Sequence, residues 1–315
     1  MVRPTLGEIG VKTGILLLLA SLLLPVAARA ACVVDNKATV ALDVVGGTIT
    51  VPVAVNGTVA TMILDTGAQR SIITEEAAHR LNVARDEWVG TTMRGIGGIE
   101  SRPNADPRTL TLGGVPLVRR TLSHDTSLTV GIIPRTRIGD LVIDGALGRD
   151  FLASFDLDLD VPDRRVTLYR VQGCAGRFLP WQGDYTAVPV SLLDQDALIV
   201  PVRLDAMPLR ALLDTGASAS LVAAPGIFRL GLQPGGFVND PADQVSGVGS
   251  HVVTMHRHTF RSLQVGGQAA SDPVIWAAPG VHLTPIVDML LGADWLAERR
   301  IWISYATRQL FVAAR

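Results

Sequence analysis

Two copies of the tripeptide Asp-Thr-Gly are the residues of this sequence best suited to chemistry. One copy spans Asp65–Gly67 and the other Asp214–Gly216, and each follows an apolar run that reads as a strand. Glycine permits backbone angles that other residues resist, so each aspartate is presented on a tight turn. A positioned carboxyl group can accept or donate a proton during catalysis. If the two turns face each other, both carboxyls cannot stay ionised, and they share one proton.

A single Asp-Thr-Gly triplet occurs often by chance, but these two hold equivalent positions in an internal repeat. Residues Thr50–Val83 align without gaps on Ile199–Leu232, and this offset of 149 residues carries the first triplet onto the second. Farther along, Leu147–Leu152 matches Leu291–Leu296. Agreement of order, spacing and sequence indicates a duplication. Two copies of this size predict two lobes related by a pseudo-two-fold axis, which would bring the two aspartates together.

The elements that must position the triplets are strands joined by tight turns. Thr48–Val55 and Thr58–Leu64 are separated by Asn-Gly, a strong hairpin signal, and the second strand delivers Asp65 at its end. Thr74 is expected to cap a short helix that ends near Leu81. The second half follows the same pattern, so we expect an all-β fold of two similar lobes with short helices.

The first thirty residues have the pattern of a secretory signal peptide. A basic start precedes an apolar run that is too short for a membrane-spanning helix, and small residues place the cleavage site after Ala30. We therefore expect export to the periplasm or the exterior of a bacterial cell. No other segment is long and apolar enough to span a membrane, so no span is expected after cleavage.

Two cysteines, Cys32 and Cys174, follow the predicted signal peptide. Because an exported protein meets an oxidising compartment, we expect a disulfide between them, and two unpaired thiols are the alternative. The chain after residue 30 is expected to divide into an N-terminal lobe (31–173), a linker rich in glycine and proline (174–186) and a C-terminal lobe (187–315).

The composition argues against several classes of function. A net charge of −1, with 48% hydrophobic and 18% charged residues, does not fit a disordered chain or a nucleic-acid-binding protein. The run Asp156–Asp160 alternates aspartate with leucine, which predicts a strand with its acids facing water rather than a cation site. His256 and His258 lack a suitably spaced third ligand, so we expect no metal and no cofactor.

Taken together, these features make the sequence resemble the aspartic proteases, and in particular their retropepsin branch. Each half carries Asp-Thr-Gly-Ala, then a glycine-rich segment, then a late aliphatic-Gly-x-Asp motif, and the resemblance covers nearly the whole chain after residue 30. The resemblance implies two retropepsin-like β-barrel lobes fused in one chain, which would act as a monomer.

The same resemblance implies roles for particular residues. Asp65 and Asp214 would be the catalytic pair of an aspartic endopeptidase, activating a water molecule that attacks a peptide bond of a peptide or protein substrate. The residues that would support the two turns are Thr66, Gly67, Thr215 and Gly216. The residues of two flaps that would close over an extended substrate are Gly95, Ile96, Gly97 and Gly98 in the first half and Gly247, Val248 and Gly249 in the second.

The sequence also departs from the pattern of the family. Retroviral enzymes often pair an acidic residue after Asp-Thr-Gly-Ala with an arginine of the late helix, but Gln69 and Ser218 hold the acidic positions here. The arginine is present as Arg149 in the first half and is replaced by Ala293 in the second. The alanine after each triplet lacks a hydroxyl that could stabilise a carboxylate, which predicts activity nearer mild acid or neutral pH than strong acid. A peptide- or protein-binding module without turnover is the alternative function.

Overall fold

The structure is a computed structural model of the 315-residue chain, and it describes residues 31–95, 98–118, 127–133, 135–193, 196–246, 252–284 and 286–314. The predicted signal peptide (1–30) lies outside the described residues, as do Ile96, Gly97 and 247–249 of the predicted flaps. Ala31–Arg315 is one compact unit. Within the described residues, no helix has the length and apolar character needed to cross a bilayer.

Each half of the chain builds a ten-stranded sheet. The first sheet consists of β2 (Asp43–Val45), β3 (Thr48–Val55), β4 (Thr58–Leu64), β5 (Ile72–Ile73), β6 (Ala84–Gly95), β7 (Gly98–Asp106), β8 (Leu110–Leu112), β9 (Val115–Pro116), β10 (Leu128–Val130) and β13 (Gly145–Leu147). The second consists of β17 (Ser191–Leu193), β18 (Ala197–Leu204), β19 (Met207–Leu213), β20 (Leu221–Ala223), β21 (Ala242–Ser246), β22 (Val252–Thr259), β23 (Ser262–Val265), β24 (Gln268–Ser271), β25 (Val274–Ala278) and β26 (Met289–Leu291).

The two ten-stranded sheets have the same topology. The first runs β6-β7-β10-β5-β13-β4-β3-β8-β9 with β2 on β3, and the second runs β21-β22-β25-β20-β26-β19-β18-β23-β24 with β17 on β18. Every strand of one sheet therefore has a counterpart at the same place in the other. The two similar, mainly β lobes expected from the repeat are confirmed.

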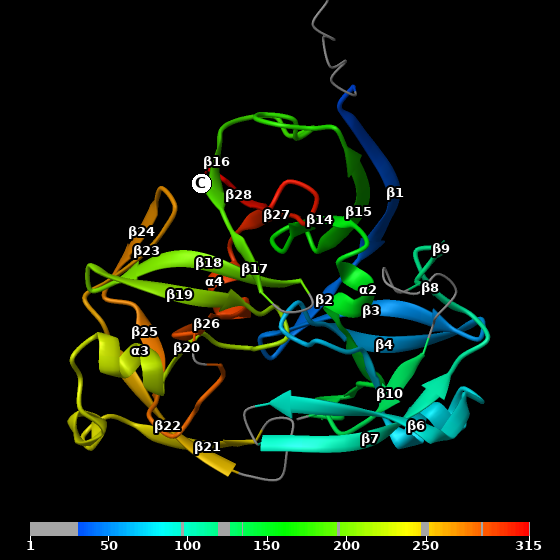
Figure 1. The fold of residues 1–315 in the computed structure, drawn as a ribbon, viewed down its shortest axis with the longest axis horizontal. Coiled ribbons are helices and arrows are strands. Elements are labelled where there is room, and N and C mark those ends of the chain that lie inside the picture. Colours follow the sequence, from blue (N-terminus) through cyan, green and yellow to red (C-terminus); the bar gives the residue numbers. More distant parts are fainter. Residues whose placement is uncertain are drawn as a thin grey trace, which may run out of the picture. The chain divides into compact units, whose positions relative to one another are not determined.

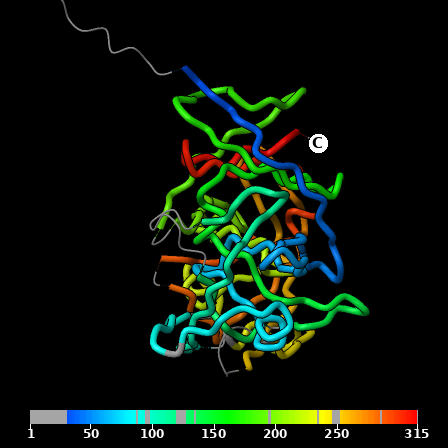
Figure 2. Tube along the Cα trace, turned by 90° about the vertical axis from the view of Figure 1, so that its right-hand side faces the viewer, coloured from blue at the N-terminus to red at the C-terminus, as the bar shows by residue number. Residues whose placement is uncertain are grey.

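A third sheet of six strands joins the two halves of the chain. Its strands are β1 (Val33–Ala41), β14 (Asp156–Asp160), β15 (Arg165–Gln172), β16 (Tyr185–Pro189), β27 (Arg300–Ser304) and β28 (Gln309–Ala313). The order β1-β15-β14-β27-β28-β16 places the antiparallel pair β14–β27 at its centre. Figures 1 and 2 show blue β1 and red β28 at the same end of this unit, away from β7 and β22. The proposed linker, 174–186, follows β15 and includes the first two residues of β16.

The remaining elements are short. They are α1 (Glu75–Arg80), α2 (Arg149–Leu152), α3 (Ala224–Arg229), α4 (Ala293–Leu296), a 3₁₀ helix (Pro234–Phe237) and the hairpin of β11 (Arg137–Ile138) and β12 (Leu141–Val142). The predicted cap of α1 is confirmed, because the Thr74 hydroxyl accepts a hydrogen bond from the amide of Ala77 at 3.2 Å.

The run of aspartates in β14 is buried, so the prediction that its acids face water was wrong. Trp302 Nε1 donates to Asp156 Oδ2 at 3.1 Å. Trp181 Nε1 donates to Asp158 at 3.0 Å, and Arg300 Nη2 donates to the same carboxylate at 2.6 Å. The alternation of aspartate and leucine was read correctly as a strand, but an aromatic layer covers the second face of this central strand. Buried carboxylates are tolerated here because each is hydrogen-bonded or paired.

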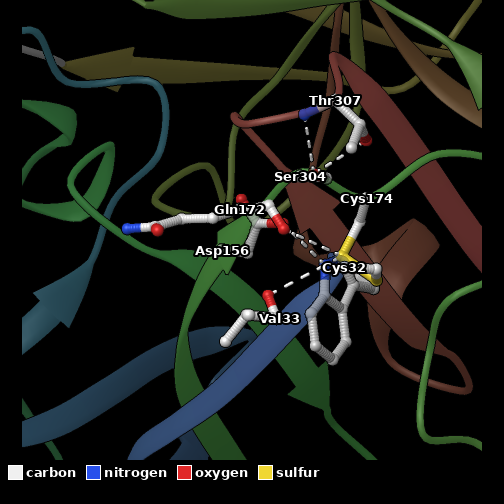
Figure 3. The surroundings of a disulfide bond; sticks show 8 residues. Cys32, Val33, Asp156, Gln172, Cys174, Ser304 and Thr307 are labelled. Carbon is white, nitrogen blue, oxygen red and sulfur yellow. Dashed lines mark hydrogen bonds between the residues drawn. A yellow bond between two sulfur atoms is a disulfide. The ribbon is translucent and has the colours of Figure 1, made fainter. Parts of the chain in front are cut away.

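The expected disulfide is present in the structure and closes the edge of the six-stranded sheet. Cys32 precedes β1 and Cys174 follows β15, and their sulfur atoms lie 2.08 Å apart (Figure 3). The register of the two antiparallel strands places Val33 opposite Gln172, which brings the cysteines together. The bond encloses a sequence separation of 142 residues.

We expect the Cys32→Ser/Cys174→Ser double variant to be less stable than the wild type by roughly 2–5 kcal/mol, because the bond restricts the unfolded chain over a long loop. Urea unfolding of residues 31–315, followed by tryptophan fluorescence, measures this difference. Dithiothreitol should destabilise the wild type and leave the double variant unchanged. Equal unfolding midpoints for wild type and variant would contradict the prediction.

Candidate active site

The strands of each lobe deliver an aspartate to the same kind of position. β4 pairs in parallel with β13, and the amide of Asp65 continues the ladder by donating to Leu147 O at 2.9 Å. In the second lobe β19 pairs in parallel with β26, and Asp214 donates to Leu291 O at 3.0 Å. Each aspartate is thus the first residue beyond a buried strand, where the chain turns.

Backbone amides of each turn hold the carboxyl groups. Ala68 N donates to Asp65 Oδ1 at 2.7 Å. Gly216 N and Ala217 N both donate to Asp214 Oδ1, each at 3.0 Å. These bonds fix the direction of each carboxyl group within its own lobe.

Each carboxyl group also rests on the glycine of the opposite lobe. A Cβ atom built on Gly67 would lie 2.3 Å from Cγ of Asp214, and one built on Gly216 would lie 2.3 Å from Cγ of Asp65. No side chain could occupy either position without displacing a carboxyl group. Glycine is therefore required by the close approach of the two turns, and the structure brings Asp65 and Asp214 together.

The two threonines exchange hydrogen bonds across the lobes. Thr66 Oγ1 donates to Leu213 O at 2.8 Å and accepts from Thr215 N at 3.2 Å. Thr215 Oγ1 donates to Leu64 O at 2.6 Å and accepts from Thr66 N at 3.0 Å. Both side chains are fully buried. Each hydroxyl satisfies two backbone groups that would otherwise lack partners, so the turns are fastened to each other.

Burial controls the protonation of the carboxyl pair. Burial of the Asp214 carboxyl group away from solvent raises its pKa to about 8, and the neighbouring charge of Asp65 adds to this effect. Burial also raises the pKa of Asp65, against the opposing influences of the Ala68 amide and the charge of Arg149. Since two adjacent carboxylates repel each other, the pair holds one proton over a wide range of pH.

A second pair of side chains in each lobe, a serine and an aspartate, supports the turns and was not predicted from the sequence. The Ser71 hydroxyl donates to Asp150 at 2.7 Å and accepts from the amide of Gly148 at 2.7 Å. In the second lobe the Ser220 hydroxyl donates to Asp294 at 2.7 Å and accepts from the Gly292 amide at 3.0 Å. The two serines are equivalent in the gapless alignment, so their repetition was a usable signal.

The late helices approach the turns differently in the two lobes. The amide of Arg149, the first residue of α2, donates to Ala68 O at 3.0 Å, and that of Ala293 in α4 donates to Ala217 O at 2.8 Å. These backbone contacts match. The side chains do not, because the buried guanidinium of Arg149 also donates to the carbonyl of Gly67.

In the sequence, the predicted flap residues fall at or between the ends of two pairs of antiparallel strands, β6–β7 and β21–β22. Gly95 and Gly98 face each other as the last described pair of the first hairpin. In the second, Ser246 pairs with Val252. Ile96, Gly97 and 247–249, the remaining flap residues, lie outside the described residues.

The histidines near the second hairpin have structural contacts. His258 Nδ1 lies 2.7 Å from Asp240 Oδ2, and the ring of His256 stacks on Phe237. In the described ranges, no three histidine, cysteine, aspartate or glutamate residues are grouped so that they could hold a metal ion.

We expect Thr66→Val to destabilise the protein by about 1–3 kcal/mol, since it leaves Leu213 O and Thr215 N buried without partners. Thr66→Ser keeps the hydroxyl and is the matched control. The free energy of unfolding from denaturant titration distinguishes the two variants. A valine variant as stable as the serine variant would show that the exchange contributes little.

Comparisons with known proteins agree with this architecture. A family model described as aspartyl protease matches residues 51–151 and 200–295, one match in each lobe. Among solved structures, the aspartic proteinase from Irpex lacteus is similar with a TM-score of 0.53 at 15% identity, over 90% of this chain and 97% of that one. Basic 7S globulin from soybean matches with a TM-score of 0.47 at 12% identity, over 89% and 95% of the two chains.

A search of curated proteins found no match. The likeness to the Irpex lacteus enzyme concerns the fold, whereas the family match covers both turns that carry Asp-Thr-Gly and more than half of the chain. The chain belongs to the aspartyl protease family.

Proposed function

We propose that this protein is an aspartic endopeptidase in which Asp65 and Asp214 are the catalytic residues. The observation that carries the proposal is the packing of each buried carboxyl group on the glycine of the other lobe, with a pKa raised by burial. Such a pair offers one carboxylate and one carboxylic acid at the same place and the same pH.

Hydrolysis then requires only a water molecule held between the two groups. The carboxylate takes a proton from the water molecule while the water oxygen attacks the carbonyl carbon of the peptide bond. At the same time the carboxylic acid gives its proton to the carbonyl oxygen. The group that took the proton from water then gives it to the nitrogen of the tetrahedral diol. As the carbon–nitrogen bond breaks, a hydroxyl of the diol gives its proton to the other carboxylate. The products are a carboxylic acid and an amine, and the pair returns to its single proton.

The β6–β7 and β21–β22 hairpins are proposed as the flaps that cover an extended peptide. Both belong to the sheets that carry the aspartates, and Figure 1 shows them at the end of the unit away from the six-stranded sheet. An extended peptide can hydrogen-bond to such hairpins as an added strand, with its side chains contacting alternate pockets.

The single chain supplies both aspartates, so we propose a monomeric enzyme. Export is proposed from the signal-like residues 1–30 and is compatible with the Cys32–Cys174 disulfide, which requires an oxidising compartment. On this basis the substrates are periplasmic or extracellular peptides or proteins. The lobes at 31–173 and 187–315 remain the proposed domains.

We expect Asp65→Asn and Asp214→Asn each to lower the rate of peptide cleavage by about 10²- to 10⁴-fold, because each removes one half of the acid–base pair. Cleavage of a peptide library by residues 31–315, with products identified by mass spectrometry, measures the loss. Asp184→Asn is the matched control, since its side chain is 95% exposed. Undiminished cleavage in either active-site variant would refute the assignment.

We expect cleavage to extend from mild acid to neutral pH and to fall as the pH rises past about 8, the value to which burial raises the pKa of Asp214. Above that pH the pair loses the proton that must reach the substrate carbonyl. The dependence of kcat/KM on pH, measured from pH 2 to 10, tests this. A profile with its maximum near pH 2 would be incompatible with the raised pKa values.

The same raised pKa values predict a pH dependence of stability that needs no turnover. The folded protein binds the proton of Asp214 more tightly than the unfolded chain does, since its pKa rises from 3.8 to about 8. This contribution is complete below the ordinary value and is lost as the pH rises towards about 8. Wild type should therefore lose more stability than Asp214→Asn between pH 4 and 8. Parallel stability curves for the two proteins would contradict the prediction.

A further inference from the structure

The surroundings of the two carboxyl groups match almost residue for residue. In both cases a Cβ atom built on the opposite glycine would lie 2.3 Å from the carboxyl carbon. The hydrogen bonds between the two threonines are reciprocal. Each carboxylate oxygen accepts from the amide three residues later, Ala68 N for Asp65 and Ala217 N for Asp214. These contacts by themselves would give the two groups equal affinities for the shared proton.

The symmetry fails at the first residue of the late helices. Arg149 is 8% exposed, its amide is bonded to Ala68 O, and its guanidinium reaches the carbonyl of Gly67, in the turn that follows Asp65. Ala293 holds the equivalent place beside Asp214 and carries no charge. One buried positive charge therefore lies against the turn of the first lobe, without an equivalent on α4 in the second.

We propose that Arg149 divides the two roles between the carboxyl groups: its charge keeps Asp65 as the carboxylate that takes a proton from water, and it leaves Asp214 as the acid that protonates the substrate carbonyl. Arg149 is thus a positioning residue, which acts on the reaction through Asp65. This inference rests on the proposed peptidase function.

Other charged and titratable groups also lie near Arg149. Asp150 follows Arg149 in α2, and Tyr305, in the turn after β27, is close enough to interact with its charge, as are Asp65 and Asp214 in the two active-site turns. Asp150 forms an ion pair with Arg70 at 3.4 Å. Burial raises the pKa of Tyr305, so this phenol stays neutral and does not compete as an anion.

The direction of the pKa shifts agrees with the geometry. The positive charge of Arg149 opposes the effect of burial on Asp65, and of the two active-site carboxylates Asp65 interacts with the charge of Arg149 more strongly than Asp214 does. An adjacent arginine typically lowers the pKa of an aspartate by about 1–3 units.

The test titrates one carboxyl group at a time. Asp214→Asn leaves Asp65 alone, and Asp65→Asn leaves Asp214 alone, each facing a neutral amide of the same shape. Protein labelled with ¹³C at the aspartate carboxyl carbon gives one signal that is absent from the double variant Asp65→Asn/Asp214→Asn. We expect the pKa of Asp65 in the first variant to lie at least about one unit below that of Asp214 in the second.

Arg149 variants then assign the cause. Arg149→Met in each background should bring the two pKa values together, and Arg149→Lys, which keeps the charge, should preserve most of their separation. Arg300→Met is the matched control, because it removes an arginine that pairs with buried Asp158 in the six-stranded sheet. It should lower stability and leave the separation intact.

The activity profile provides a second readout. In the otherwise unaltered enzyme, Arg149→Met should move the acidic limb of kcat/KM towards higher pH by about one unit, since the ionisation of Asp65 loses the favourable charge of Arg149. An equal loss of activity at every pH, with unmoved limbs, would show that Arg149 has only a structural role.

The outcomes separate this inference from the proposed function. Equal pKa values for Asp65 and Asp214 in the single variants would overturn the inference, even if Arg149→Met could not be purified folded. A separation that persists in Arg149→Met would overturn it as well. If wild type cleaves peptides and Asp65→Asn does not, the proposed function stands in either case. If wild type cleaves nothing while the predicted separation is found, the effect of Arg149 on the carboxyl groups stands and the peptidase proposal fails.

Discussion

Two carboxyl groups buried against each other are the constraint on which the rest of this structure depends. Water would normally stabilise each charge, and burial removes that stabilisation. The pair persists because neighbouring groups hold it in place: backbone amides donate to its oxygens, glycines make room for the carboxyl groups, and the threonines join one turn to the other. The two carboxyl groups can share one proton only because they are held close together. If they were far apart, each would ionise independently.

The duplication produces this site from two copies of one turn. Each lobe needs to build only one turn, and the reciprocal bonds between Thr66 and Thr215 make the correct arrangement of one lobe a requirement for the other. Fusion in one chain also frees the two copies to diverge. Arg149 and Ala293 show this divergence, since a symmetric dimer of identical chains would carry both residues as arginine or both as alanine.

Much of the fold could be predicted from the sequence because its signals are local or repeated. The strands β3 and β4, the cap at Thr74 and the equivalence of the lobes follow from alternation, turn residues and a constant offset. The six-stranded sheet was not predicted, since β14 and β27 are far apart in the chain and no local pattern identifies them as partners. The buried acids of β14 were misread for the same reason: alternation shows that two faces differ, but not what covers each face. At the site, the repeat predicts that the aspartates, threonines and glycines lie on facing turns, and the structure brings these residues together, while their catalytic roles remain a proposal. The supporting serines were overlooked although they repeat.

The shared sheet has a consequence for how the polypeptide is made. On the ribosome, β14 is complete when about half of the chain has been synthesised, but its partner β27 begins only at Arg300. Until then one edge of β14 exposes unpaired backbone groups, and such an edge can pair with another nascent chain. Completion of the native fold therefore waits for β27 to emerge, and translation products that lack β27 and β28 would be prone to aggregate.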